Sequence, residues 1–248
     1  MAWFRRSSLL TFLTIILAVA LMLGLIVNIP AQVQARSSPN SLSSKLENAF
    51  PAPLNAEATV PTNTQGGQSR CPCVLDTEPT ALVPVFGMGE TIAEYPTFFW
   101  SISGTSFPEV EFILLDEKDK EVYKVKYALA TSAVNNSSIM SLTLPAFANL
   151  SPLKIGEKYR WVLASICTPL DRSLDHYTEG WIKRVEPNPT LARRIEQATP
   201  EERVGLYADA RLWYDTVATL SELRRDRPND KNLAEAWDTI LKLVRRRG

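Results

Sequence analysis

The chain contains 248 residues, and its 27 lysines and arginines balance its 27 aspartates and glutamates to a net charge of zero. Nucleic-acid binders usually carry a basic excess, because phosphate contacts dominate their affinity, so we expect no nucleic-acid partner. The single histidine and the three cysteines exclude a metal site built on several histidines, and we expect no cofactor. The length suits one large domain or two small ones.

The amino-terminal segment has the features of an export signal. Arg5 and Arg6 precede an almost wholly apolar run from Leu9 to Ile29, and a basic region followed by an apolar region directs a chain to a membrane. The run has about 20 residues, which is enough to span a bilayer as a helix with its amino-terminal end in the cytoplasm. Small residues up to Ala35 also permit cleavage after that position. We therefore predict that residues 1–35 are a signal sequence or a signal anchor.

This segment determines the location that we expect for the rest of the protein. The rest is predicted to work on the non-cytoplasmic side of a membrane, in a periplasm or a thylakoid lumen. Residues 36–70 are rich in Ser, Pro, Asn, Thr, Gln and Gly and have few large apolar groups, so they are predicted to form a disordered tether. Because such a tether is useful mainly behind a retained helix, we favour an anchor over a cleaved signal.

Residues 71–186 have the pattern of a β-domain. Apolar residues alternate with polar ones in short segments separated by turns, which predicts an antiparallel β-sandwich. Leu153 and Tyr159, at the entrance of one segment, resemble the tyrosine corner of immunoglobulin-like sandwiches, in which the tyrosine hydroxyl hydrogen-bonds to upstream backbone. We therefore predict an immunoglobulin-like sandwich. Its alternating sets are Phe98, Trp100 and Ile102; Val110, Phe112 and Leu114; Tyr123, Val125 and Tyr127; Met140, Leu142 and Leu144; Tyr159, Trp161 and Leu163; and Trp181 and Val185.

Residues 187–248 change to helical periodicity. Asn188 followed by Pro189 predicts an N-cap and a first helical position, and Thr199 with Glu202 predicts a capping box. A break is expected at the turn sequence that begins with Arg227, before a last helix with a clean apolar stripe. Residues 207–230 resemble one tetratricopeptide repeat. Because such arrays usually need about three repeats to be stable, we expect these helices to pack on one another and on the sandwich.

The chain also resembles an uncharacterised cyanobacterial family that is catalogued as a domain of unknown function, number 928. The resemblance covers about residues 71–245 and implies the layout described above. It implies no activity, because the family has none established. The stretches that carry it are Ala93 to Trp100, Leu144 to Leu150, Asp171 to Ser173, Glu179 to Ile182, and Trp213 to Asp215.

The three cysteines are candidates for a disulfide. Thiols beyond a membrane tend to be oxidised, and Cys71 and Cys73 are too close in sequence for an unstrained bond to each other. A bridge from either of them to Cys167 would close a long loop and stabilise the fold by roughly 3–5 kcal/mol. The alternative adds His176 to the three cysteines as a zinc set. We favour the disulfide, because the Cys-x-Cys spacing is tighter than the usual metal knuckle.

No set of residues predicts catalysis. Ser173 and His176, with a neighbouring aspartate, have the residue types of a triad, but residues three apart in a loop rarely achieve its geometry. We expect that loop to be a solvated turn in which Asp171 and Arg172 pair. The spacing of Glu94, Glu109, Glu111 and Glu179 selects no pair of carboxylates for glycoside hydrolysis, and Glu109 and Glu111 are expected to be exposed. Phe99 is expected to lie beneath the helices rather than to contact a ligand.

These observations favour a non-catalytic interaction or structural module of the cell envelope over an enzyme. The expected partners are the membrane, through the amino-terminal helix, and another protein. The alternative is a metal-binding or redox-responsive envelope protein that uses Cys71, Cys73, Cys167 and His176.

Overall fold

The computed structural model describes residues 41–51, 77–85, 87–103, 109–128, 138–147 and 150–244. These described residues belong to a single compact unit. The predicted membrane segment from Leu9 to Ile29, the cleavage candidate Ala35, and Cys71 and Cys73 lie outside the described residues. No helix among the described residues is long and apolar enough to cross a membrane.

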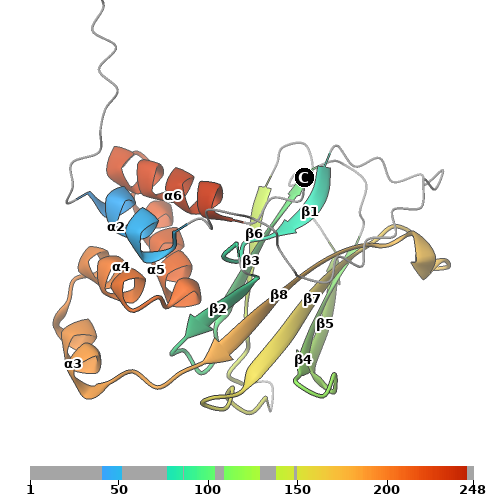
Figure 1. Cartoon of the computed structure of the whole chain (residues 1–248). Helices are drawn as coiled ribbons and strands as arrows, with labels where there is room; N and C mark the ends of the chain where they lie inside the picture. Colours follow the sequence, from blue (N-terminus) through green and yellow to red (C-terminus); the bar gives the residue numbers. More distant parts are fainter. Residues whose placement is uncertain are drawn as a thin grey trace, which may run out of the picture. The chain divides into compact units, whose positions relative to one another are not determined.

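Among the described residues, strands come first and helices last, apart from a short helix at Leu42–Ala49, so the predicted order of β then α is confirmed (Figure 1). The elements are α2 (Leu42–Ala49), β1 (Thr77–Ala81), β2 (Met88–Thr91), β3 (Thr97–Ser103), β4 (Glu109–Asp116), β5 (Glu121–Ala128), β6 (Ser138–Thr143), β7 (Lys158–Ile166), the 3₁₀ helix η2 (Arg172–Leu174), β8 (His176–Arg184), α3 (Pro189–Gln197), α4 (Pro200–Asp209), α5 (Trp213–Asp226) and α6 (Lys231–Leu243).

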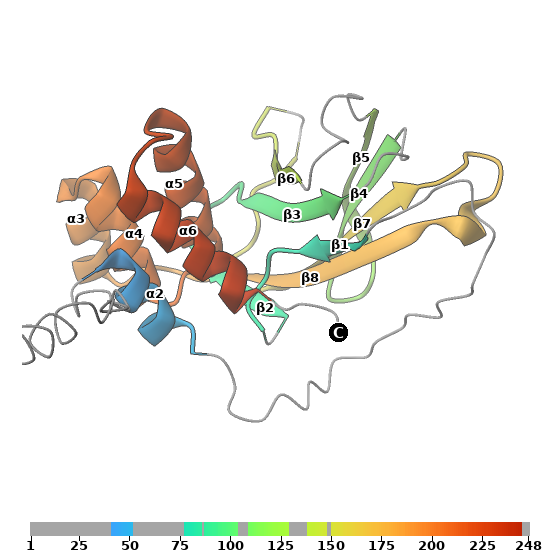
Figure 2. The same ribbon diagram turned by 90° about the horizontal axis from the view of Figure 1, so that it is seen from above.

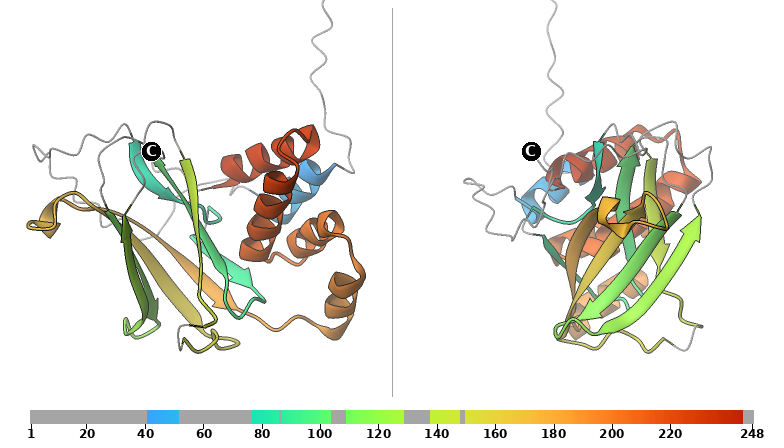
Figure 3. Two further views of the ribbon diagram at one scale, coloured as in Figure 1. Left: turned by 180° about the vertical axis from the view of Figure 1, so that it is seen from behind. Right: turned by 90° about the vertical axis from the view of Figure 1, so that its right-hand side faces the viewer.

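The strands form two sheets that share one apolar core. One sheet has the order β1-β3-β6 and the other the order β2-β8-β7-β4-β5. The ring centroid of Phe98, in β3, lies 5.0 Å from that of Phe112 in β4 and 5.6 Å from that of Trp161 in β7. The views from above and from behind show the two layers (Figure 2 and Figure 3). Alternating large side chains therefore fill the space between the sheets, as period-two patterning requires.

The prediction of wholly antiparallel sheets is wrong at β2. This strand runs parallel to β8, with Met88 opposite Trp181 and Thr91 opposite Arg184. The other pairs of adjacent strands among the described residues are antiparallel. A parallel neighbour needs a long connection, and the five strands between β2 and β8 in the chain supply it. Alternation within one strand carries no information about the direction of its partner, so the sequence pattern gives no sign of this pairing.

The predicted inward set of β8 is also wrong. Thr178 and Ile182 are buried together with Gly180, while Trp181 is only partly buried on the other face. A Cβ atom added to Gly180 would lie 2.5 Å from Val83 Cγ1 and 2.8 Å from Trp161 Nε1. Val83 and Trp161 therefore take the space that a side chain at position 180 would need. The aromatic residue Trp181 wrongly indicated which face of β8 points into the core.

Tyr159 forms the corner that its position predicts. Its hydroxyl accepts a hydrogen bond from the backbone N–H of Lys154 at 3.0 Å and donates to Glu157 Oε2 at 3.3 Å. Its side chain is buried, as is that of Leu153. The corner fixes the turn that leads into β7, because one side chain both fills the core and satisfies upstream backbone.

The helix ends follow the sequence signals. Asn188 Oδ1 accepts from Leu191 N at 2.8 Å to cap α3, and Thr199 and Glu202 form a reciprocal capping box at the start of α4. α5 ends at Asp226, and Asp230 caps α6. Local hydrogen bonding determines these ends, so a single sequence is enough to locate them.

The first residues of α5 enter the β-sandwich. Trp213 Nε1 donates to the carbonyl of Leu82 at 3.0 Å. The hydroxyl of Tyr214 accepts from Trp161 Nε1 at 2.8 Å and donates to the carbonyl of Trp181 at 2.9 Å. The side chains of Trp213 and Tyr214 are each at most 2% exposed. The helices and the sheets therefore share one core, and the predicted boundary near residue 186 separates two kinds of structure within one unit.

The tether predicted over residues 36–70 is wrong for α2. Ser41 caps this helix through its hydroxyl, which accepts from Ser44 N at 3.2 Å. Leu46 is fully buried, and the ring of Phe50 meets that of Trp213 edge-on at 4.9 Å. Few apolar residues are enough to hold α2 in the fold, because they recur at helical spacing on the side that faces α4 and α6.

Two glycine substitutions test this packing. Gly180→Ala is expected to lower the free energy of unfolding by roughly 1–3 kcal/mol, because its Cβ overlaps Val83 and Trp161. The matched control is Gly205→Ala in α4, where a Cβ would meet only the flexible end of Lys45 at 3.4 Å and the helix gains propensity. Thermal unfolding followed by circular dichroism measures both. Equal effects of the two variants would contradict the close packing at Gly180.

Asp215 is a buried carboxyl in the first turn of α5. Its Oδ2 accepts from the backbone N–H of Ile92 at 3.2 Å. Burial raises the pKa of Asp215 from its ordinary value of 3.8 to about 6, against the opposing hydrogen bonds from Thr91 and nearby backbone. The folded state therefore binds a proton more tightly at this group than the unfolded state does.

The protein is expected to become more stable as the pH falls from 7.5 to 5, because Asp215 takes up its proton in the folded state first. The gain is about 1 kcal/mol. The gain levels off below about pH 3.8, which is the ordinary pKa that Asp215 has in the unfolded chain. Asp215→Asn is expected to remove this dependence, which urea unfolding at the two pH values measures. A variant that keeps the same pH dependence as the wild type would assign the effect to other groups.

Candidate functional site

Of the cysteine and histidine candidates for a metal site, Cys167 and His176 lie among the described residues. Cys167 follows β7 and is 7% exposed. His176 begins β8, opposite Ser165 of β7. Within the described part of the chain, no group of three or more His, Cys, Asp and Glu side chains is placed to hold a metal ion. The pairing of Cys167 with Cys71 or Cys73 stays a prediction.

The loop that contains Ser173 is organised around η2. Asp171 Oδ1 accepts hydrogen bonds from the backbone N–H of Ser173 at 3.1 Å and from its hydroxyl at 2.6 Å, which is a helix cap. The Arg172 guanidinium pairs with Asp175, so the expected pairing of Arg172 with Asp171 is wrong. Asp175 also accepts from the backbone N–H of Cys167 at 3.2 Å. These contacts fix the loop between β7 and β8.

Glu111 is the carboxylate that the sequence pattern misplaces. It was expected to be exposed, but it is only 5% exposed. Its carboxylate lies 3.2 Å from Arg172, 3.4 Å from Lys124 and 3.8 Å from Lys126. Burial opposes its ionisation, but the hydrogen bond and charge of Arg172, helped by Lys124, hold the pKa of Glu111 below its usual value. The side chains of neighbouring β5 and of η2 cover this outer face of β4, which alternation alone does not reveal.

Two of the other carboxylates, Glu94 and Glu179, belong to separate ion pairs. Glu94 lies 3.0 Å from Arg184, and Glu179 lies 3.2 Å from Arg160. A pair of carboxylates that hydrolyses a glycoside must face a common space. These contacts hold each carboxylate against its own arginine, so they give no support to a hydrolytic site.

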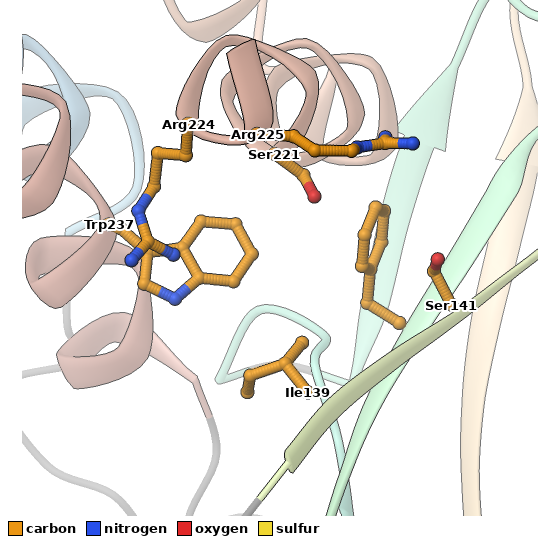
Figure 4. Close-up of a pocket in the computed structure, with 7 residues that line it drawn as sticks. Ile139, Ser141, Ser221, Arg224, Arg225 and Trp237 are labelled. Atoms are coloured by element: carbon orange, nitrogen blue, oxygen red, sulfur yellow. The ribbon is translucent and has the colours of Figure 1, made fainter. Parts of the chain in front are cut away.

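A pocket of about 440 Å³ lies between the outer face of the β3–β6 pair and the helices α5 and α6 (Figure 4). Its floor comes from the sheet and its wall from the last turn of α5, with one indole from α6. Two adjacent arginines of α5 reach into it. The lining residues are Phe99, Ile139, Ser141, Ser221, Arg224, Arg225 and Trp237.

The register of β3 and β6 explains the floor of the pocket. Phe99 pairs with Ser141, and Ser101 pairs with Ile139, so these side chains share the outer face of the sheet. Phe99 is 4% exposed, and its ring lies 6.5 Å from that of Trp237, nearly perpendicular to it. The expectation that Phe99 lies beneath the helices is confirmed. It also borders the pocket.

The electrostatic character of the pocket is cationic. The Arg224 guanidinium lies over the Trp237 ring at 4.9 Å from its centroid, a cation–π contact that orients the charge (Figure 4). Neither Arg224 nor Arg225 has an ion-pair partner in the part of the chain that the structure describes. No acidic side chain lines the pocket as described. The site therefore presents positive charge beside apolar surface.

A second pocket, of about 460 Å³, lies where α2, β2 and α6 meet. Its lining combines apolar residues such as Phe50 and Leu243 with one cation, Arg211, and one anion, Glu90. Charges of both signs give it no net preference for an anionic or a cationic ligand. The pocket beside Arg224 and Arg225 is therefore the better candidate site.

The described lining of the candidate pocket carries groups that can bind an anion. Ser141 and Ser221 are the hydroxyl groups in its lining, and the described lining gives neither of them a histidine, carboxylate or cysteine as a base. The two arginines can bind carboxylate or another anion through charge-assisted hydrogen bonds. Sequence reasoning missed Arg224 and Arg225, because paired basic residues at the end of a helix are common and only the tertiary fold brings β6 opposite them.

Comparison with known proteins identifies a family and no activity. A family model described as Domain of Unknown Function (DUF928) matches residues 63–246. No curated protein matches the chain.

Two solved structures share limited likeness with part of the fold. One is the apo structure of Bacteroides uniformis beta-glucuronidase 3, with a TM-score of 0.26, 12% identity, and coverage of 44% of this chain and 12% of that one. The other is a CARDB domain from Pyrococcus furiosus in complex with di-metal ions, with a TM-score of 0.26, 9% identity, and coverage of 44% of this chain and 91% of that one. These TM-scores are too low to carry an argument about fold or function.

The family match is much broader than these partial likenesses. It begins before β1 and extends past α6, so it takes in both sheets and all four carboxy-terminal helices. The protein therefore belongs to the family described as Domain of Unknown Function, DUF928.

Proposed function

We propose that the protein is a non-catalytic interaction module of the cell envelope, and that it binds a macromolecular partner in the pocket between β6 and the helices α5 and α6. The observation that carries the proposal is the pair of arginines, Arg224 and Arg225, which face this pocket without an ion-pair partner among the described residues. Charges that are already compensated contribute little to a new contact, whereas these two are available to one.

The location that we propose is the non-cytoplasmic side of a membrane, to which the segment from Leu9 to Ile29 tethers the protein. The basic and apolar pattern of that segment supports this proposal. A binding module held at a membrane gains effective concentration for partners in the same membrane or compartment. The proposed tether is therefore useful to an interaction module.

We also propose that the sandwich is immunoglobulin-like. The strand order supports this: β1, β3 and β6 form one sheet, while β8, β7, β4 and β5 form the body of the other, which is the division seen in that class. The hydroxyl corner of Tyr159 at the start of β7 supports it further. The pair of α4 and α5 is the part that we propose to be repeat-like.

The disulfide of Cys167 is proposed to link it to Cys71 or Cys73 and to fasten the chain that precedes β1 to the end of β7. A sulfur in a disulfide is not a thiolate, and the thiolate is the form that binds a metal. The proposed disulfide at Cys167 therefore weighs against the metal-binding alternative that includes His176.

Mass spectrometry of the exported protein, alkylated with and without prior reduction, tests this linkage. Cys167 is expected to be alkylated only after reduction, together with one of the two amino-terminal cysteines. Cys71→Ser and Cys73→Ser in separate proteins identify the partner, because only one of them is expected to free Cys167. A Cys167 that reacts fully without reductant would overturn the proposal.

Site-specific photo-crosslinking in cells that make the full chain tests the interaction proposal. A photoreactive residue in place of Ile139, which lines the pocket and is 38% exposed, is expected to form an adduct with a partner on illumination. The adduct is expected to fall several-fold when Arg224 and Arg225 are both changed to Ala, because the partner loses its charge-assisted contacts.

The matched control places the same photoreactive residue at Ile155, which is 52% exposed in the turn before β7 and does not line the pocket. An equal pattern of adducts at Ile139 and Ile155, or an adduct at Ile139 that does not depend on the arginines, would count against a binding site in this pocket.

A further inference from the structure

We infer that the partner is an extended peptide segment with acidic side chains, and that it adds to the three-stranded sheet as a strand along β6. This inference rests on the proposed function and deepens it, because it states the chemistry and the geometry of the partner. Peptide recognition by strand addition uses backbone hydrogen bonds for affinity and side-chain pockets for specificity.

The edge of β6 is the first observation. β6 ends the order β1-β3-β6, and among the described strands it pairs with β3 alone. Alternate backbone groups of a strand point to either side, so the far side of β6 carries N–H and C=O groups that no described strand engages. An open edge of this kind is a template for another strand.

The composition of β6 separates it from the other strands at sheet edges. Natural proteins protect such edges with charged side chains and proline. β1 contains Glu78 and Pro79, β2 contains Glu90, and β5 contains Lys124 and Lys126. β6, from Ser138 to Thr143, contains no charged residue and no proline. It is therefore the described edge strand that is least protected against pairing with another chain.

The charges beside that edge select the side chains of the incoming strand. Arg224 and Arg225 stand over the face of β6 that carries Ile139 and Ser141. Successive side chains of an added strand alternate between the two faces of the sheet, so every second side chain would face these arginines. The segment expected here has carboxylates at alternate positions, with apolar or β-branched residues between them.

A sugar polymer is the competing anionic ligand, and the aromatic residues of the pocket argue against it. Sugar recognition uses an open aromatic face. Trp237 is 4% exposed and has Arg224 over its ring, and Phe99 is also 4% exposed. Neither ring offers a free face, whereas Ile139 and Ser141 of β6 and Arg225 of α5 are exposed.

Fluorescence anisotropy with the full chain in detergent micelles tests the inference. The probe is a short fluorescein-labelled peptide of alternating valine and glutamate. It is expected to bind at least about tenfold more tightly than the same peptide with glutamine in place of glutamate, because each carboxylate gains a charge-assisted bond to arginine. Methylation of alternate backbone nitrogens is expected to weaken binding to a similar degree, because it removes the donors that pair with β6.

Arg225→Ala in the protein is expected to weaken binding of the glutamate peptide about tenfold. Its matched control is Arg194→Ala, which removes the same charge from an exposed position on α3 and is expected to leave binding unchanged. Unchanged thermal unfolding of both variants establishes that the fold is intact.

Equal binding of the glutamate and glutamine peptides, or no effect of backbone methylation, would overturn the inference. Binding of an acidic oligosaccharide that depends on Arg225, without binding of the peptide, would overturn it and leave the proposed function standing. Absence of peptide binding together with absence of crosslinks at Ile139 would overturn both the inference and the proposed function.

Discussion

The hydroxyl group of Tyr214 connects helix α5 to the five-stranded sheet. It accepts from the indole of Trp161 and donates to the carbonyl of Trp181, so a single buried atom in α5 satisfies polar groups of two adjacent strands. A buried donor or acceptor left without its partner costs roughly 1–3 kcal/mol. The sheets therefore have a binding site for α5 built into their core, and the position of α5 in turn determines where the other helices pack.

The candidate site is a consequence of that anchorage. With its first turn held between the sheets, α5 carries Arg224 and Arg225 along the outside of the three-stranded sheet. α6 returns beside it and brings Trp237 against Phe99. A rigid helix held at its base presents its last turn at a fixed place, which is the preorganisation that a binding site requires. The scaffold thus places two charges beside β6, the edge strand of the described three-stranded sheet, from the last turn of a helix.

Sequence reasoning predicted the parts of the fold that depend on local interactions. Caps at Asn188 and Thr199, strand alternation and the corner at Tyr159 involve neighbours within a few residues, so their signals are present in the sequence. The parallel pairing of β2, the burial of Glu111 and the pocket beside Arg224 depend on segments that are distant in the chain. One sequence carries no signal for these contacts, since each residue involved has an ordinary local pattern.

The packing of α2 has a consequence for the order in which the protein folds. α2 lies near the amino-terminal end of the chain, yet it packs on α6, which is the last helix. Contacts so distant in sequence form late, because the chain between them loses its freedom first. Leu46 consequently lacks its full packing surface until both α4 and α6 have emerged. A nascent chain thus leaves this apolar residue incompletely covered, and the helices around α2 pack fully only after α6 has formed.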